Sequence, residues 1–193
     1  MRKYSQLNRG FTLIELLTVI AIIGVLAGLL FPAISAAMKK AKGAKAHTEV
    51  HAIETAWKSY FNEYGHWPVD ASTKCLGQDA TETLATPGIQ TKNDIAALLL
   101  GSTATGIGNY VPTDPSQNPK HIQFLNLKAD PTTGQFLDPW NHPYVFLFDV
   151  DYDNQIKNNV LTPTFPNTIP RTVIVWSLGP DGVFNTSDDI RSW

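Results

Sequence analysis

Residues 11–31 read FTLIELLTVIAIIGVLAGLLF, a long apolar stretch that follows a short basic segment. As a helix it spans about 31 Å, which matches the ~30 Å hydrocarbon core of a bilayer. It is apolar on every side, unlike a helix on the surface of a soluble domain. Its one charged residue is Glu15, and a carboxylate in a membrane helix costs about 2.5–3.5 kcal/mol on insertion scales. The stretch therefore predicts a membrane helix whose carboxylate has a specific partner.

Two ordinary kinds of N-terminal segment leave Glu15 unexplained. A secretory signal peptide has an uncharged core and then small residues at its cleavage site, so the carboxylate and the long apolar run fit it poorly. A plain signal anchor fits the hydrophobicity but offers the carboxylate no partner. The flanking charges do not orient the helix, because the basic residues before it are balanced by four lysines between residues 39 and 45.

Residues 9–17 read RGFTLIELL and resemble the leader junction of type IV prepilins. In that family a basic leader ends in glycine, an aromatic residue follows, and glutamate is the fifth residue of the mature chain. The resemblance implies that a prepilin peptidase cuts after Gly10 and methylates the new amino group of Phe11. Glu15 of one subunit would then pair with the amine of its neighbour, so that assembly neutralises a buried charge. A generic signal anchor is the alternative.

The helix is predicted to continue beyond the apolar run. Pro32 removes a helical hydrogen bond and predicts a kink or local melting there, where prepilins commonly carry proline. Residues 33–64 stay rich in helix formers. Apolar side chains recur in them at helical spacing: Val50, Ile53, Trp57, Tyr60, Phe61 and Tyr64. Gly65 and Pro68 end the pattern. We therefore predict one helix from Phe11 to Tyr64, whose second half backs a globular head.

The head is predicted to contain few regular elements. Residues 66–120 are rich in turn-forming residues, with a short helix over residues 95–100 that Gly101 stops. Strands are predicted at His121–Leu127, Tyr144–Phe148 and Arg171–Trp176, which are rich in β-branched or aromatic residues. One long helix, then loops and a few strands indicate an α+β chain with the helix packed on a small antiparallel sheet. That is the pilin-like fold.

These elements predict four parts along the chain. Residues 1–10 form the leader peptide and residues 11–32 the transmembrane and polymerisation helix. Residues 33–64 form its amphipathic continuation, and residues 65–193 form the head, with a variable loop and a C-terminal calcium-type loop.

The charge of the chain argues against nucleic-acid binding, and its cysteine content excludes an intramolecular disulfide. Three of the 15 basic residues lie in the leader, so the mature chain has fewer basic residues than its 17 acidic ones. An acidic head argues against binding nucleic acid through bulk electrostatics. Cys75 is the only cysteine, so the chain cannot form an intramolecular disulfide.

Two head segments resemble the major pseudopilin of type II secretion, the protein G family. Residues 138–144 read DPWNHPY, where that family tends to have DPWGNPY. Residues 177–190 read SLGPDGVFNTSDDI and resemble the family's calcium loop. Asn141 and Asn185 stand where glycine is usual, and asparagine enters positive-φ conformations more easily than most residues.

The C-terminal loop has the chemistry of a calcium site. Calcium takes about six to eight oxygen ligands from carboxylates, carbonyls and water. The predicted ligands are the carboxylates of Asp181, Asp188 and Asp189 and the main-chain carbonyls of Leu178 and Val183. A bound ion would restrain a loop that no disulfide can restrain. An exposed acidic turn without an ion is the alternative.

Two other groups of potential metal ligands are predicted to bind no metal. Residues 149–154, DVDYDN, begin like an EF-hand loop but lack its glycine and its final glutamate, so a polar hairpin tip is predicted after the strand at Tyr144–Phe148. His47 and His51 are four residues apart on a helix, but their order is not that of a zinc protease, and solvated histidines are predicted.

The resemblance implies a structural, non-catalytic subunit of a type II secretion pseudopilus in the bacterial inner membrane, with its head in the periplasm or outside. Its implied partners are the bilayer, identical subunits in a helical filament, the prepilin peptidase, minor pseudopilins, and an assembly platform with its ATPase. A type IV pilin for adhesion, motility or DNA uptake is the alternative, although many such pilins close a loop with a disulfide. The chain carries no hydrolase, phosphate-loop or metalloprotease motif, so no enzyme is predicted.

Overall fold

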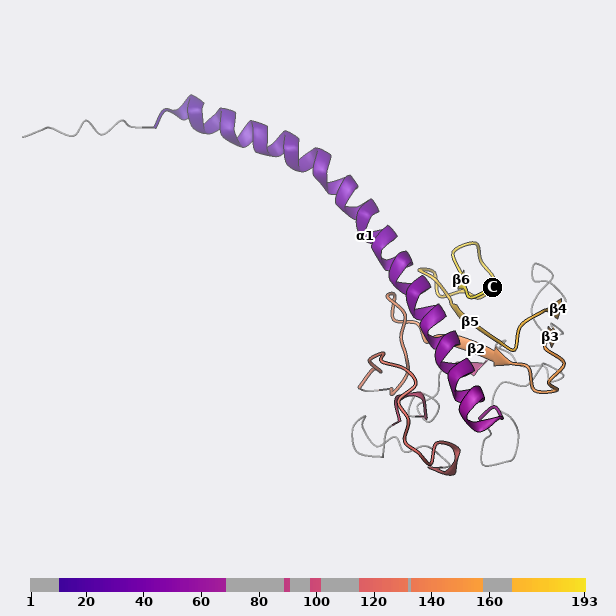
Figure 1. Cartoon of the computed structure of the whole chain (residues 1–193). Helices are drawn as coiled ribbons and strands as arrows, with labels where there is room; N and C mark the ends of the chain where they lie inside the picture. Colours follow the sequence, from indigo (N-terminus) through magenta and orange to yellow (C-terminus); the bar gives the residue numbers. More distant parts are fainter. Residues whose placement is uncertain (1–10, 69–88, 91–97, 102–114, 132, 158–167) are drawn as a thin grey trace, which may run out of the picture. The chain divides into compact units, whose positions relative to one another are not determined.

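The computed structural model describes residues 11–68, 89–90, 98–101, 115–131, 133–157 and 168–193 (Figure 1). Its elements are α1 (Leu13–Tyr64), β1 (Ile89–Gln90), the 3₁₀ turn η1 (Pro115–Gln117), β2 (Val145–Phe148), β3 (Ile156–Lys157), β4 (Thr168–Ile169), β5 (Val173–Ser177) and β6 (Ile190–Arg191). The chain forms two compact units, Met1–Ala41 and Lys42–Trp193, and α1 contributes to both.

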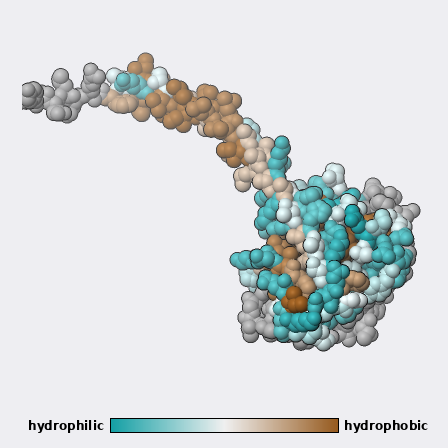
Figure 2. Space-filling model, in the orientation of Figure 1, coloured by the Kyte–Doolittle hydropathy of each residue, from teal (hydrophilic) through white to brown (hydrophobic). Residues whose placement is uncertain are grey.

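The first unit presents an exposed apolar helix. Every described residue up to Ala41 is exposed, including Leu13 at 87% and Phe31 at 79%. Figure 2 shows most of this part of α1 as a hydrophobic surface, with hydrophilic patches near its two ends. By length and composition the helix can cross a membrane. Pro32 lies inside α1, which continues through it, so the local melting predicted there does not occur. An apolar surface of this extent requires lipid or other protein chains around it.

The second unit places the remainder of α1 against a sheet. Four residues of the predicted apolar stripe of α1 are fully buried: Val50, Ile53, Trp57 and Tyr60 are each 0% exposed. The other two, Phe61 and Tyr64, are half-buried and pack against the same core. The Trp57 ring lies 5.4 Å from that of Phe146 and 5.0 Å from that of Phe148, both on β2. Aromatic contacts at these distances stabilise a core beyond the area that they bury. The predicted α+β architecture is confirmed.

The sheet is antiparallel, with strand order β1-β2-β5-β6, and β3 pairs with β4 in a separate two-stranded sheet. Alternate residues of β2 point to opposite faces. Phe146 and Phe148 join the core under α1, whereas Val145 and Leu147 join a second cluster with Ile156, on β3. Both faces are therefore buried, which explains why β2 is apolar at every position. The strands predicted at Tyr144–Phe148 and Arg171–Trp176 are confirmed as β2 and β5.

The strand predicted at His121–Leu127 is wrong, because that segment has irregular backbone. The amides of Phe124 and Leu125 both donate to the carbonyl of Leu99, at 2.8 and 3.0 Å. His121 has a φ of 52°, outside the range of strands. The segment is therefore hydrogen-bonded to the end of a short helix that contains Leu99, and not to a neighbouring strand.

That element is the end of the predicted short helix. Leu98–Leu100 is helical, and residues 95–97 lie outside the described residues. Gly101 follows with a φ of 63°, and a Cβ there would lie 2.6 Å from the carbonyl oxygen of His121. Gly101 therefore ends the helix, as predicted, and also allows the irregular segment to approach closely.

Candidate functional site at the N-terminus and the C-terminal loop

At the start of α1, Glu15 and Thr12 cap the helix reciprocally. The Glu15 carboxylate accepts hydrogen bonds from the Thr12 amide at 2.8 Å and the Thr12 hydroxyl at 2.7 Å. The Glu15 amide donates to the Thr12 hydroxyl at 3.3 Å. This is a capping box, whose signal is Thr-x-x-Glu; no role was predicted for Thr12, although that spacing stands in the sequence. Among the described residues Glu15 has hydrogen-bond donors but no basic partner. Gly10 and the leader lie outside the described residues.

In the head, the turn at residues 138–142 is organised by Asp138, which is 3% exposed. Its Oδ1 accepts from the amides of Trp140 and His142, both at 2.9 Å. Its own amide donates to the carbonyl of His142 at 2.8 Å. Asn141 has a φ of 71° and Asn185 one of 66°, so both asparagines adopt the positive-φ conformation expected where the family has glycine.

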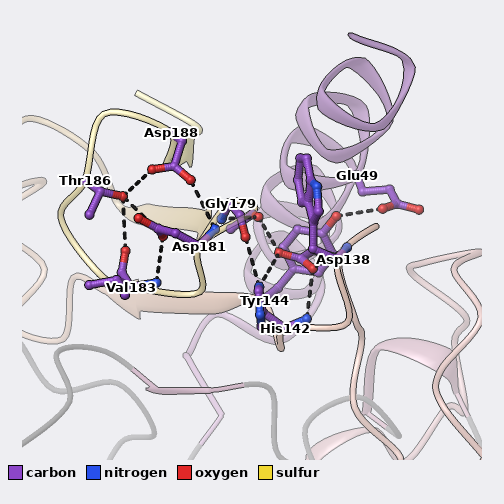
Figure 3. Close-up of polar contacts among 11 residues, drawn as sticks. Glu49, Asp138, His142, Tyr144, Gly179, Asp181, Val183, Thr186 and Asp188 are labelled. Atoms are coloured by element: carbon purple, nitrogen blue, oxygen red, sulfur yellow. Dashed lines mark hydrogen bonds and ion pairs between the residues drawn. The ribbon is translucent and has the colours of Figure 1, made fainter. Parts of the chain in front are cut away.

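The same turn holds the start of the C-terminal loop (Figure 3). The hydroxyl of Ser177 donates to Oδ2 of Asp138 at 2.6 Å and accepts from the amide of Gly179 at 3.1 Å. Nδ1 of His142 lies 2.9 Å from the carbonyl oxygen of Gly179. Two segments 37 residues apart are thus joined by side chains of the turn.

Tyr144, directly after this turn, ties it to α1. The Tyr144 hydroxyl donates to Glu49 at 2.6 Å (Figure 3). Burial, together with the hydrogen bond to Glu49 and its charge, raises the pKa of Tyr144. Lys45 lies 3.7 Å from the same carboxylate. The turn, and through it the loop, is therefore bonded to α1 as well as to the sheet.

Within the C-terminal loop, the Thr186 hydroxyl lies among oxygen atoms. It is 2.5 Å from Oδ1 of Asp188, 3.2 Å from the carbonyl of Val183 and 3.4 Å from Oδ1 of Asp181 (Figure 3). The hydrogen bond from Thr186 lowers the pKa of Asp188. Thr186 was not among the predicted ligands, although a hydroxyl residue so close to the acidic residues in the sequence could have indicated it. The loop thus gathers Asp181, Val183 and Asp188 around one hydroxyl.

Known proteins are similar to this chain at its N-terminus and, more weakly, along its length. Residues 6–31 match the family model of the prokaryotic N-terminal methylation motif. The start of the chain is that of a type IV prepilin-like protein. The type IV major pilin protein PilA of Myxococcus xanthus (strain DK1622) is 44% identical over 61 residues, which are 32% of this chain and 28% of that pilin.

The similarity of this prepilin-like protein to one secretion component is longer. The type II secretion system core protein G of Pectobacterium carotovorum subsp. carotovorum is 27% identical over 188 residues, which are 96% of this chain and 85% of that protein. Among solved structures, the major pseudopilin of the type 2 secretion system of enterohaemorrhagic Escherichia coli matches with a TM-score of 0.37 and 21% identity, over 82% of this chain and 92% of that chain.

The oxygen atoms around Thr186 in the prepilin-like protein fit a hard cation. One hydroxyl proton cannot satisfy three acceptors at once, and two of them belong to carboxylates that repel each other. A calcium ion, bound by carboxylate, carbonyl and hydroxyl oxygens, would satisfy them together. A Cβ on Gly179 would lie 2.5 Å from the Asp188 carbonyl oxygen and 2.8 Å from its Oδ2, so only glycine allows this close approach.

The other predicted ligands lie less centrally. Oδ2 of Asp189 accepts from the Asn185 amide at 2.9 Å and lies 3.4 Å from the Arg191 guanidinium, while its Oδ1 is buried with no hydrogen-bond partner among the described residues. Burial raises the pKa of Asp189. The side chain of Leu178 packs in the second apolar cluster. The structure brings Asp181, Val183 and Asp188 together and places the Asp189 carboxylate beside Arg191.

A second acidic group follows β2. Carboxylate oxygens of Asp149, Asp151 and Asp153 lie within 4.8 Å of one another. Asp149 is 2% exposed and accepts from the amides of Asp153 and Asn154, at 3.2 and 2.8 Å. Burial, and then a hydrogen bond with Asp151, raises the pKa of Asp149. The predicted hairpin tip is wrong, because β2 pairs with β5 and β3 pairs with β4; the segment is a polar turn between two sheets.

The helix histidines lie toward solvent. The rings of His47 and His51 are 4.6 Å apart and edge to face. His47 is exposed and His51 half-buried. Nδ1 of His51 lies 3.3 Å from Oε2 of the buried Glu54, which Lys58 also contacts at 2.6 Å. The two histidines therefore contact each other on the surface of α1, and His51 also contacts Glu54.

Proposed function

We propose that this prepilin-like protein is a structural, non-catalytic subunit of a type II secretion pseudopilus. The observation that carries the proposal is the reach of its similarity to core protein G, over 96% of the chain and therefore through the head. The similarity to the type IV pilin, which favours the alternative function in adhesion, motility or DNA uptake, covers only 32% of the chain.

The exposed apolar helix supports a role in assembly, because neighbouring subunits can bury it. Its apolar side chains need a bilayer before assembly and neighbouring helices afterwards. Cleavage after Gly10 and methylation of Phe11 leave a cationic amine at the edge of this helix, where Glu15 of another subunit can pair with it. An ion pair completed only between subunits fixes their register, because either charge alone is costly to bury.

The setting follows from this role. The helix anchors the subunit in the bacterial inner membrane, where prepilin peptidase processes it, and the head lies in the periplasm. The assembly platform and its ATPase then add it to a filament of identical subunits, with minor pseudopilins as further partners. The filament acts as a piston or scaffold for protein export.

Processing and assembly test this proposal directly. The full chain is expressed in a type II secretion strain that lacks core protein G and carries a folded reporter cargo. We expect mass spectrometry to find a chain that begins at a methylated Phe11, and the reporter to be secreted. Gly10→Val should block cleavage, whereas Gly24→Val, at a helix glycine with nothing within 4 Å of an added Cβ, should be processed normally. Filaments built only by a pilus apparatus, without secretion, would establish the pilin alternative instead.

We also propose that the C-terminal loop binds calcium. Asp181, Val183, Thr186 and Asp188 would hold the ion, with the Leu178 carbonyl and Asp189 as further predicted ligands. The ion would neutralise carboxylates that otherwise share one hydroxyl proton, and would restrain the loop against the sheet.

Asp188→Asn is expected to weaken calcium binding at least tenfold, because it removes a charged ligand but keeps the size of the side chain. Titration calorimetry on the full chain in detergent micelles measures the affinity. Asp153→Asn, the same change in the other acidic turn, is the control and should bind like the unaltered chain. The unaltered head should melt at a higher temperature in calcium than in chelator. At a calcium concentration of 100 times the Kd, binding should raise the free energy of unfolding by about 2.7 kcal/mol. Absence of binding at millimolar calcium would rule out the site.

A further inference from the structure

His142 has no role in the functions proposed above, although it stands where the protein G family tends to have asparagine. Its Nδ1 lies 2.9 Å from the carbonyl oxygen of Gly179 (Figure 3). A Cβ on Gly182 would lie 2.7 Å from Nε2 of His142 and 2.9 Å from its Cε1, so the imidazole packs directly on that glycine. One side chain therefore contacts both glycines of the C-terminal loop.

The turn that carries His142 is held independently of any ion. The His142 amide and carbonyl are both bonded to Asp138, at 2.9 and 2.8 Å. Asp138 is 3% exposed and also accepts from Ser177, on β5, at 2.6 Å. A buried and fully bonded carboxylate of this kind gives the imidazole a rigid base.

The C-terminal loop consequently has two differently supported halves. Residues 177–182 are held by Asp138 and His142 through contacts with the turn. The second half is joined to the first through the Thr186 hydroxyl and the two carboxylates around it. Two predicted ion ligands, Asp181 and Val183, lie on either side of Gly182, the residue on which the imidazole packs.

We propose that His142 is a positioning residue for the cation site of the C-terminal loop. It supplies no ligand; it holds Gly179 and Gly182 in place before the ion binds, so that binding has to order only the second half of the loop. This inference rests on the proposed calcium site. Residues that orient ligands in this indirect way typically change metal affinity about 10–100-fold when they are removed.

The comparison of His142→Ala with His142→Asn tests this role. Alanine removes both the donor to Gly179 and the ring on Gly182, whereas asparagine keeps a side-chain N–H for the Gly179 carbonyl. By calorimetry on the full chain in detergent, we expect His142→Ala to bind calcium at least about tenfold more weakly. His142→Asn should remain within about threefold of the unaltered chain, which is less than the loss expected for a removed positioning residue. His47→Ala, the same change at an exposed helix histidine, should bind normally.

A second measurement separates positioning from general stability. Amide hydrogen exchange in chelator should be faster across residues 179–182 in His142→Ala and unchanged in β2 and β5. If His142→Ala does not fold, His142→Leu keeps a bulky side chain without a donor, and the same loss of affinity is expected. Normal calcium affinity in the folded alanine or leucine variant would overturn the role of His142 and leave the calcium site intact. Failure of the unaltered chain to bind calcium would overturn the site itself.

Discussion

Glu15→Leu is expected to abolish filament assembly while the head stays folded. Leucine suits a membrane helix better than glutamate does, so the subunit should still insert and be processed. What it loses is the carboxylate that we propose pairs with the methylated amine of a neighbouring subunit. Electron microscopy and sedimentation of processed subunits should find no filaments, and circular dichroism should give the normal head signal.

Glu15→Gln separates pairing from capping. Glutamine keeps an oxygen that can accept from the amide and hydroxyl of Thr12, as the Glu15 carboxylate does at 2.8 and 2.7 Å, but it removes the charge. If pairing drives assembly, glutamine should fail almost as completely as leucine. Normal filaments from the glutamine variant would show that helix capping, rather than the charge, is what the position supplies.

Trp57→Ala is expected to destabilise the head by about 3–5 kcal/mol, the usual cost of emptying a buried aromatic site. Trp57 is fully buried, and its ring contacts Tyr60 at 5.6 Å as well as Phe146 and Phe148. A head of this size has a total stability of only about 5–15 kcal/mol, so such a loss is large. Urea unfolding of the full chain in detergent, followed by near-ultraviolet circular dichroism, measures it.

Trp57→Phe is the matched control. Phenylalanine keeps an aromatic ring against β2, and it removes an indole N–H that is buried without a hydrogen-bond partner among the described residues. We expect it to cost less than about 1.5 kcal/mol, as for other conservative core exchanges. Equal losses in both variants would mean that the packing of α1 on β2 does not depend on filling this site.

Elements governed by near neighbours in the sequence could be predicted. The apolar run and the helical spacing of Val50, Ile53 and Trp57 predicted one helix to Tyr64, which the structure has as α1. The aromatic and β-branched residues of β2 and β5 predicted both strands. These patterns repeat every two residues or every three to four, so each can be recognised within one segment.

Elements that depend on distant partners could not be predicted. The segment at His121–Leu127 has the composition of a strand, yet two of its amides bond to Leu99. The acidic turn after β2 reads as a hairpin tip, yet the strands that flank it pair elsewhere. In both cases the residues nearby are suitable for strand pairing, and a competing contact from another element determines the outcome.

The candidate sites divide in the same way. The prepilin junction at Gly10, Phe11 and Glu15 and the acidic C-terminal loop could be predicted from the sequence, because both are runs of adjacent residues. The position of Thr186 among three acceptors, and the contact of His142 with Gly179, 37 residues away, follow from the folded chain and not from any motif. A motif gives the chemical groups that are available, whereas the packing of α1 and the sheet determines which of them come into contact.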